Sequence, residues 1–112
     1  MLKKILLSAS LCALLSPIAE ASGWSQGGKI VEVYNHGWTV MIRMDGNFVD
    51  RSGGKCSGTQ FYSINKSSSG FDPIFSQIML AYAANKPVKL WLDGNCTGQG
   101  SKYQNFISIR SY

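Results

Sequence analysis

Apolar and polar residues alternate along several short stretches of this chain, which predicts β-strands with one buried face. In residues 38–44, for example, apolar side chains occupy every second position, beginning at Trp38. The sequence Asp-Gly-Asn begins at Asp45 and again at Asp93, and each occurrence predicts a hairpin turn. Strand patterns cover residues 29–34, 38–44, 59–64, 88–93 and 106–110.

An uncharged helix pattern lies between the third and fourth predicted strands. Asp72 can cap its start, Pro73 suits the first helical position, and Asn85 followed by Pro87 ends it. Its apolar residues extend well beyond the roughly 100° stripe of an ordinary surface helix. Either loops of the same monomer cover the additional apolar surface of the helix, or this surface contacts other copies of the chain. The candidates for such an oligomer contact are Phe75, Met79, Leu80 and Tyr82.

The first 21 residues have the pattern of a secretory signal peptide. Lys3 and Lys4 precede an apolar run that is too short to span a bilayer, and small residues at Ala19 and Ala21 suit cleavage after Ala21. The predicted mature chain has 112 − 21 = 91 residues, enough for a single domain over residues 22–112. We therefore expect a secreted or periplasmic protein, and the short Lys-Lys signal suggests a bacterial source.

Cleavage would remove Cys12 and leave two cysteines in a compartment where disulfides persist. We expect Cys56 and Cys96 to be bonded, and closing a loop of about 40 residues would stabilise the fold by roughly 4 kcal/mol. A metal site or a reactive thiol is the alternative, but both lack supporting histidines because His36 is the single histidine. No metal and no cofactor are expected.

The charge balance is mildly basic. The chain has 11 Lys and Arg against 6 Asp and Glu, and removing Lys3, Lys4 and Glu20 leaves 9 − 5 = +4. These charges are scattered along the sequence, so they indicate a charged surface and not a nucleic-acid patch. We expect no nucleic-acid partner and no membrane span.

The order of three strands, one helix and two strands predicts a mainly β fold, a five-stranded OB-fold-like barrel in which the helix plugs the gap between the third and fourth strands. Around the helix, the likeness becomes more specific. The sequences GKIVEVYNHG and FSQIMLAYAANKPVKLWLDG, together with a cysteine before the third strand and another after the fourth, resemble the B subunits of subtilase cytotoxin. The resemblance covers roughly residues 28–96.

This resemblance implies OB-fold subunits in a ring pentamer, as in the related pertussis-like and typhoid toxins, with the helices lining the pore. It also implies binding to host-surface glycans and pairing with an enzymatic A subunit. In that family, a serine before the first strand and a tyrosine after the helix contact the sugar. The matching positions here are Gly27 and Leu92, so the resemblance implies a shared scaffold more than a shared ligand.

Catalytic chemistry is not indicated. Residues 23–27 match G-x-S-x-G, but that motif needs a preceding central strand, a following helix and a distant histidine. Here it lies at the predicted mature N-terminus, before a strand, and the carboxylates are spread along the chain. We therefore predict a protein that is not an enzyme.

Aromatic side chains are the stronger indication of function, because indole and phenol rings stack on the apolar faces of sugars. The alternative is that these rings fill a small core or a subunit interface. The predicted ligand-binding residues are Trp24, Ser25, Asn47, Tyr62, Lys89, Trp91 and Asp93.

Two functional hypotheses follow. The first is an exported binding module, assembled as a homo-oligomer such as a ring pentamer, that recognises a glycan or glycoprotein. The second is an assembly or inhibitory protein of the envelope that binds another protein through a sheet edge or the helix face, without sugar.

Overall fold

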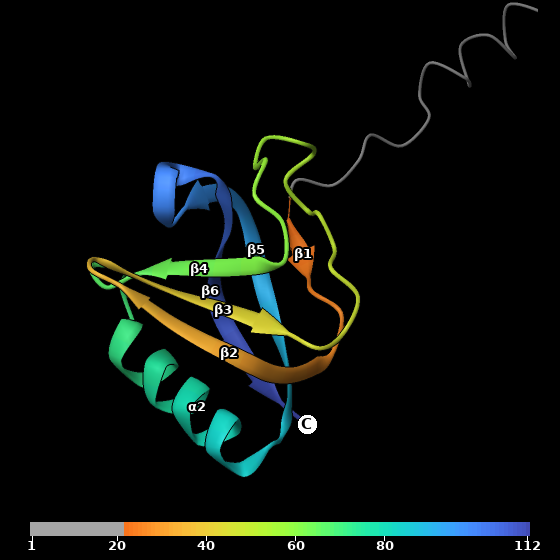
Figure 1. Ribbon diagram of the computed structural model, residues 1–112, viewed down its shortest axis with the longest axis vertical. Coiled ribbons are helices and arrows are strands. Elements are labelled where there is room, and N and C mark those ends of the chain that lie inside the picture. The colour runs from red at the N-terminus through yellow and green to blue at the C-terminus, as the bar shows by residue number, and fades with distance from the viewer. Residues whose placement is uncertain (1–21) are drawn as a thin grey trace, which may run out of the picture.

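The computed structural model describes residues 22–112, so the predicted signal peptide lies outside the described residues. Six strands, one α-helix and a short 3₁₀ helix follow one another along this part of the chain (Figure 1). Their order is β1 (Gly23–Trp24), β2 (Gly28–His36), β3 (Thr39–Met44), β4 (Phe61–Asn65), α2 (Phe71–Ala84), β5 (Pro87–Thr97), η1 (Gln99–Ser101) and β6 (Tyr103–Ser111).

Five of the strands form a closed ring of hydrogen-bonded neighbours. β5 pairs with β2, β2 with β3, β3 with β4, β4 with β6, and β6 again with β5. The β4–β6 pair is parallel and the others are antiparallel. The prediction of a mainly β, OB-fold-like arrangement with one helix between the third and fourth strands of the ring is confirmed.

The core lies inside this ring, and α2 lies against one end of it (Figure 1). Alternation along the strands brings one set of side chains inward, as expected for a sheet with one buried face. Ile78 and Ala81 of α2 join the same cluster. The completely buried apolar side chains are Val40, Ile42, Ile64, Ile78, Val88, Leu90, Leu92 and Phe106.

The prediction for α2 is wrong about the residue that caps its start and is confirmed for the residue that ends it. At its start, Gly70 is the cap residue in the left-handed region with φ 75°, and no side chain caps the helix. Asp72 lies in the first turn instead, so the prediction that it caps the helix is wrong. At the other end, Asn85 adopts φ 56° and its N–H bonds the carbonyls of Ala81 and Tyr82, so the predicted stop is confirmed.

Two sequence predictions at the strand ends are wrong. Trp38 does not continue the buried face of β3, because it lies in the tight turn after His36 and is 65% exposed. Asp93 and Gly94 do not form a hairpin turn, because β5 runs through them. The β5–β6 register shifts between Leu92 and Cys96, and Gly94 has φ 85°, so this Asp-Gly forms an irregularity within the strand.

The predicted disulfide joins Cys56 and Cys96, with 5.5 Å between their Cα atoms. It ties the long connection between β3 and β4 to β5, and a disulfide is compatible with a location outside the cytoplasm. In that connection, the Ser52 hydroxyl and then its amide donate to Asp50 and hold the pKa of this carboxyl below its ordinary value of 3.8. Within residues 22–112, no helix has the length and apolar character needed to cross a membrane.

Candidate functional site

Two predicted binding residues, Trp24 and Trp91, are direct neighbours in the structure. β1 pairs with β5 so that Trp24 lies opposite Trp91, and their ring centroids are 5.3 Å apart at an interplanar angle of 82°. This edge-to-face arrangement is favourable for two aromatic rings. Both side chains are half-buried, so each indole keeps part of its surface open to solvent.

Cationic and phenolic side chains from β5 and β6 extend this pair. The Arg110 guanidinium carbon lies 4.8 Å from the Trp24 ring centroid, and Lys89 lies opposite Arg110 in the β5–β6 register. The Lys89 ammonium lies 5.4 Å from the ring centroid of Tyr112, which is itself exposed. Both contacts have the geometry of a cation–π interaction. We call Trp24, Lys89, Trp91, Arg110 and Tyr112 the tryptophan cluster.

Ser25 positions the tryptophan cluster and is not a surface group. Its side-chain oxygen accepts a hydrogen bond from the Leu90 N–H at 3.0 Å, and its own N–H donates to the Leu90 carbonyl at 2.8 Å. The Ser25 hydroxyl donates to the Gln26 carbonyl, and the residue is 4% exposed. The serine of the G-x-S-x-G match therefore docks β1 on β5. The Arg51 side chain adds a bond from Nε to the Trp24 carbonyl at 3.2 Å.

Gly27 makes room for the end of the chain. A Cβ atom added there would lie 1.5 Å from the Tyr112 hydroxyl, so any larger residue would displace that ring. The Tyr112 hydroxyl therefore occupies the space that a side chain at position 27 would need. Leu92 is completely buried in the core.

Besides Ser25, three predicted ligand residues lie outside the tryptophan cluster. Tyr62 is 2% exposed and stacks on Phe48 in the core, so the expectation that it reaches the surface is wrong. Its hydroxyl accepts the Val49 N–H at 3.3 Å, and burial raises the pKa of this phenol. Asn47 is exposed in the loop after β3. Asp93 is occupied within the sheet, as described next.

The Asp93 carboxylate organises the irregular part of β5. It accepts bonds from the main-chain and side-chain nitrogens of Asn95 and from the side chain of Asn105. Thr97 continues this chain of contacts by donating to Asn105 and bonding Ser63. Asp93 therefore has a structural partner for each carboxylate oxygen.

The predicted oligomer residues lie on α2 with different exposure. Leu80 is 71% exposed, and Met79 and Tyr82 are also exposed, whereas Phe75 is half-buried and stacks on Phe71. Beside Leu80 is a shallow groove of about 510 Å³ between α2 and the end of β6. Its lining residues are Gln77, Leu80, Ala81, Ala84, Lys86, Ser111 and Tyr112. Tyr112 thus borders both this groove and the tryptophan cluster.

Sequence reasoning missed Arg110 and Tyr112, because only the β5–β6 register brings them to Lys89 and the tryptophans. The alternation in residues 106–110 identified a strand but not its neighbour. Within the described residues, no group of three or more His, Cys, Asp and Glu side chains is arranged to hold a metal ion. The cluster can therefore offer ring faces, two cations and a hydroxyl to a ligand.

Comparisons of the chain with protein-family models, with curated proteins and with solved structures found no match. The resemblance to toxin B subunits remains a prediction from the residues quoted above.

Proposed function

We propose that this chain is an exported, non-enzymatic protein that binds a glycan or glycoconjugate through the tryptophan cluster. The observation that carries the proposal is the half-exposed Trp24–Trp91 pair with Arg110 and Lys89 beside it. Indole faces stack on the apolar faces of sugars, and the cations and the Tyr112 hydroxyl can hydrogen-bond to sugar oxygens. The mature protein is secreted or periplasmic in this proposal.

A glycan array probed with the oxidised protein tests this function. Glycans bound by the unaltered protein should lose binding when Trp91→Ala or Arg110→Gln is introduced. Val31→Ala is the matched control, because Val31 is an exposed residue of β2 outside the cluster. Arg110 is exposed, so its variant should fold even if Trp91→Ala does not. Failure to bind any glycan, or equal binding by all three variants, would contradict the proposal.

We also propose that copies of the chain assemble through the outer face of α2. Leu80, Met79 and Tyr82 would be covered in such a homo-oligomer, and a ring pentamer is the arrangement that the toxin resemblance implies. Light scattering on the oxidised protein measures its mass directly. Leu80→Glu should reduce an oligomer to monomers, whereas a monomeric unaltered protein would contradict this part. Whether an enzymatic A subunit accompanies such a ring depends on the same resemblance.

The groove beside Leu80 favours a second candidate function, the binding of a different polypeptide without sugar. Its apolar lining from α2 lies next to the end of β6. Retention of one defined polypeptide by the unaltered protein, lost in Leu80→Glu and unaffected by free sugars, would favour this second function over the first.

A further inference from the structure

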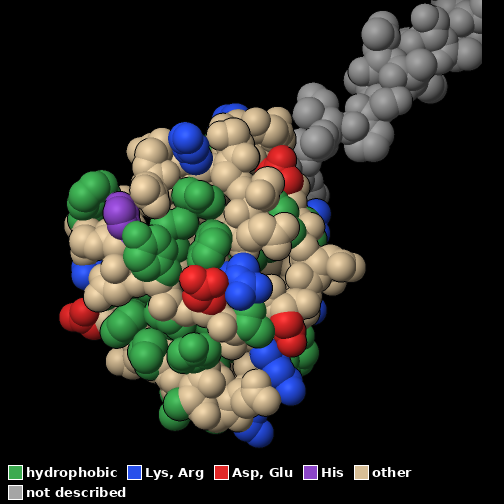
Figure 2. Space-filling view, in the orientation of Figure 1, with side chains coloured by type: hydrophobic (Ala, Val, Ile, Leu, Met, Phe, Trp, Pro, Cys, Tyr) green, Lys and Arg blue, Asp and Glu red, His purple; other side chains and the backbone are tan. Residues whose placement is uncertain are grey.

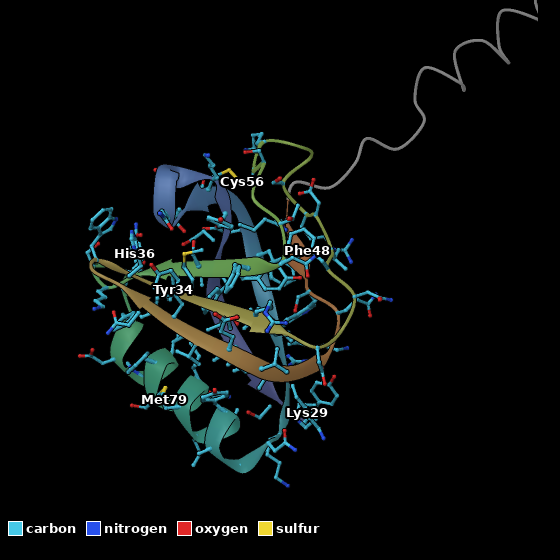
Figure 3. All side chains as sticks on the ribbon, viewed as in Figure 1. Lys29, Tyr34, His36, Phe48, Cys56 and Met79 are labelled. Atoms are coloured by element: carbon cyan, nitrogen blue, oxygen red, sulfur yellow. A yellow bond between two sulfur atoms is a disulfide. The ribbon has the colours of Figure 1, made fainter. Side chains whose placement is uncertain are left out.

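Three aromatic rings form a row at the tip of the β2–β3 hairpin, away from the tryptophan cluster. Tyr34 and His36 are alternate residues of β2 and lie on one face, and Trp38 follows in the turn with its ring beside that of His36. Figure 3 shows Tyr34 and His36 together near this tip. The ring centroids are 5.3 Å apart from Tyr34 to His36 and 5.6 Å apart from His36 to Trp38. We call these residues the hairpin row.

Hydrogen bonds position the first two rings of the hairpin row and the backbone of its tip. The Tyr34 hydroxyl and His36 Nδ1 are 2.9 Å apart, which fixes the first two rings relative to each other. The Thr39 hydroxyl donates to the His36 carbonyl, and the Lys66 N–H donates to the Trp38 carbonyl at 2.8 Å. A positioned ring loses less conformational entropy on binding than a free one.

The hairpin row contributes little to the core. Trp38 and Tyr34 are exposed, whereas Met41, which lies opposite Tyr34 in the register, is buried. Residues directly opposite in an antiparallel pair point to the same face, so Met41 lies beside Tyr34 and not behind it. None of the three rings belongs to the core cluster. Figure 2 shows apolar side chains gathered around the single histidine on this face. Exposed aromatic rings that lie outside the core cluster are typical of a binding surface.

The charges on this face favour an uncharged ligand. Glu32 and Arg43 lie on the same face of the hairpin and bond each other at 3.1 Å, so their charges compensate. A nucleic-acid strand would require a cationic groove along its backbone in addition to stacking rings. A purely apolar partner would have to bury this ion pair and the Tyr34 hydroxyl.

We propose that the hairpin row is a second binding site, for an extended chain of uncharged sugar residues. The ring spacing is comparable to the length of one pyranose unit, so consecutive rings can stack on consecutive sugars. Interplanar angles of 54° and 58° turn each ring relative to the next. The imidazole, the phenol hydroxyl and the Glu32–Arg43 pair are available to the sugar hydroxyls at the edges of the row.

Tryptophan fluorescence tests this site directly. The chain has three tryptophans, so Trp24→Phe with Trp91→Phe leaves Trp38 as the single reporter. The probes are linear tetramers of β-1,4-linked glucose and of β-1,4-linked N-acetylglucosamine. Saturable change of Trp38 emission is expected with at least one probe. Tyr34→Ala and His36→Ala should each weaken binding about tenfold. Ile107→Ala, an exposed residue of β6, should bind as the reporter protein does.

Calorimetry on the protein with all three tryptophans separates this site from the tryptophan cluster. Trp38→Ala should abolish the heat of binding to the same tetramers, and Ile107→Ala, which lies in neither site, should leave it unchanged within about twofold. Loss of binding in Arg110→Gln but not in Trp38→Ala would overturn the second site and support the first. No binding of either tetramer up to about 10 mM would also overturn it, as would preferential binding of single-stranded DNA.

Discussion

Replacing Ser25 by alanine should destabilise the protein although the change removes a single oxygen atom. That oxygen is the acceptor of the Leu90 N–H, at 3.0 Å. Leu90 is completely buried and Ser25 is 4% exposed, so water cannot easily replace the lost acceptor. A buried donor left without a partner costs about 1 to 3 kcal/mol. We expect the free energy of unfolding of Ser25→Ala to fall by that amount.

Denaturant unfolding of the oxidised protein, followed by circular dichroism, measures this loss. Ser76→Ala is the matched control, because Ser76 lies on the exposed side of α2 and its variant should stay within about 0.5 kcal/mol of the unaltered protein. Because Ser25 also holds β1 on β5, the same variant should change the emission of Trp24 and Trp91. A stability loss no larger than that of the control would refute the assignment of Ser25 as the group that docks β1.

The remaining predictions concern the disulfide, the helix and one carboxylate. Replacing both cysteines of the disulfide with alanine should lower the free energy of unfolding by about 4 kcal/mol, because the bond closes a loop of 40 residues. Guanidinium unfolding measures this loss, and a loss under about 1 kcal/mol would contradict the loop-closure reasoning. Ile78→Ala should lower the free energy of unfolding by about 2 to 5 kcal/mol because the side chain is completely buried. Leu80→Ala should change the free energy of unfolding of the monomer by no more than about 0.5 kcal/mol. Equal losses of the two variants in thermal unfolding would contradict the described orientation of α2. Hydrogen bonds from Ser52 lower the pKa of Asp50, so the Asp50 carboxylate should stabilise the fold above about pH 4 and lose this effect as the pH falls through the lowered pKa. A stability difference between the unaltered protein and Asp50→Asn that stays constant from about pH 6 to pH 2 would contradict this prediction.

Local sequence patterns predicted the order of the helix and the five strands of the ring because each pattern has a local cause, whereas the two-residue strand β1 was not predicted. Alternation along β3 and β5 reflects the two faces of a strand, and Asn85 ends α2 because it tolerates the left-handed conformation. The cysteine count was likewise sufficient for the disulfide, since removing the predicted signal peptide leaves only one possible intramolecular pair.

The candidate site was predicted in part. Trp24, Lys89 and Trp91 were identified as surface aromatic and polar residues, and the structure brings them together. Tyr62 was included for the same chemical reason, although its ring lies in the core. The hydrophobic character of a tyrosine does not distinguish the two locations, because a ring with one polar tip suits either. Asp93 was read as a turn residue because Asp-Gly is common both in hairpins and in strand irregularities.

From the sequence alone follow the succession of strands and helix, the disulfide and the mildly basic charge, because each depends on neighbouring residues or on composition. Which residues meet at a surface was decided only by the tertiary structure. Trp24, Trp91 and Arg110 come from three strands, and the register of β1 and β6 on β5 joins them. The physical reason is that register depends on packing and hydrogen bonds between segments far apart in the chain, and a shift of one residue would turn each of these side chains to the opposite face.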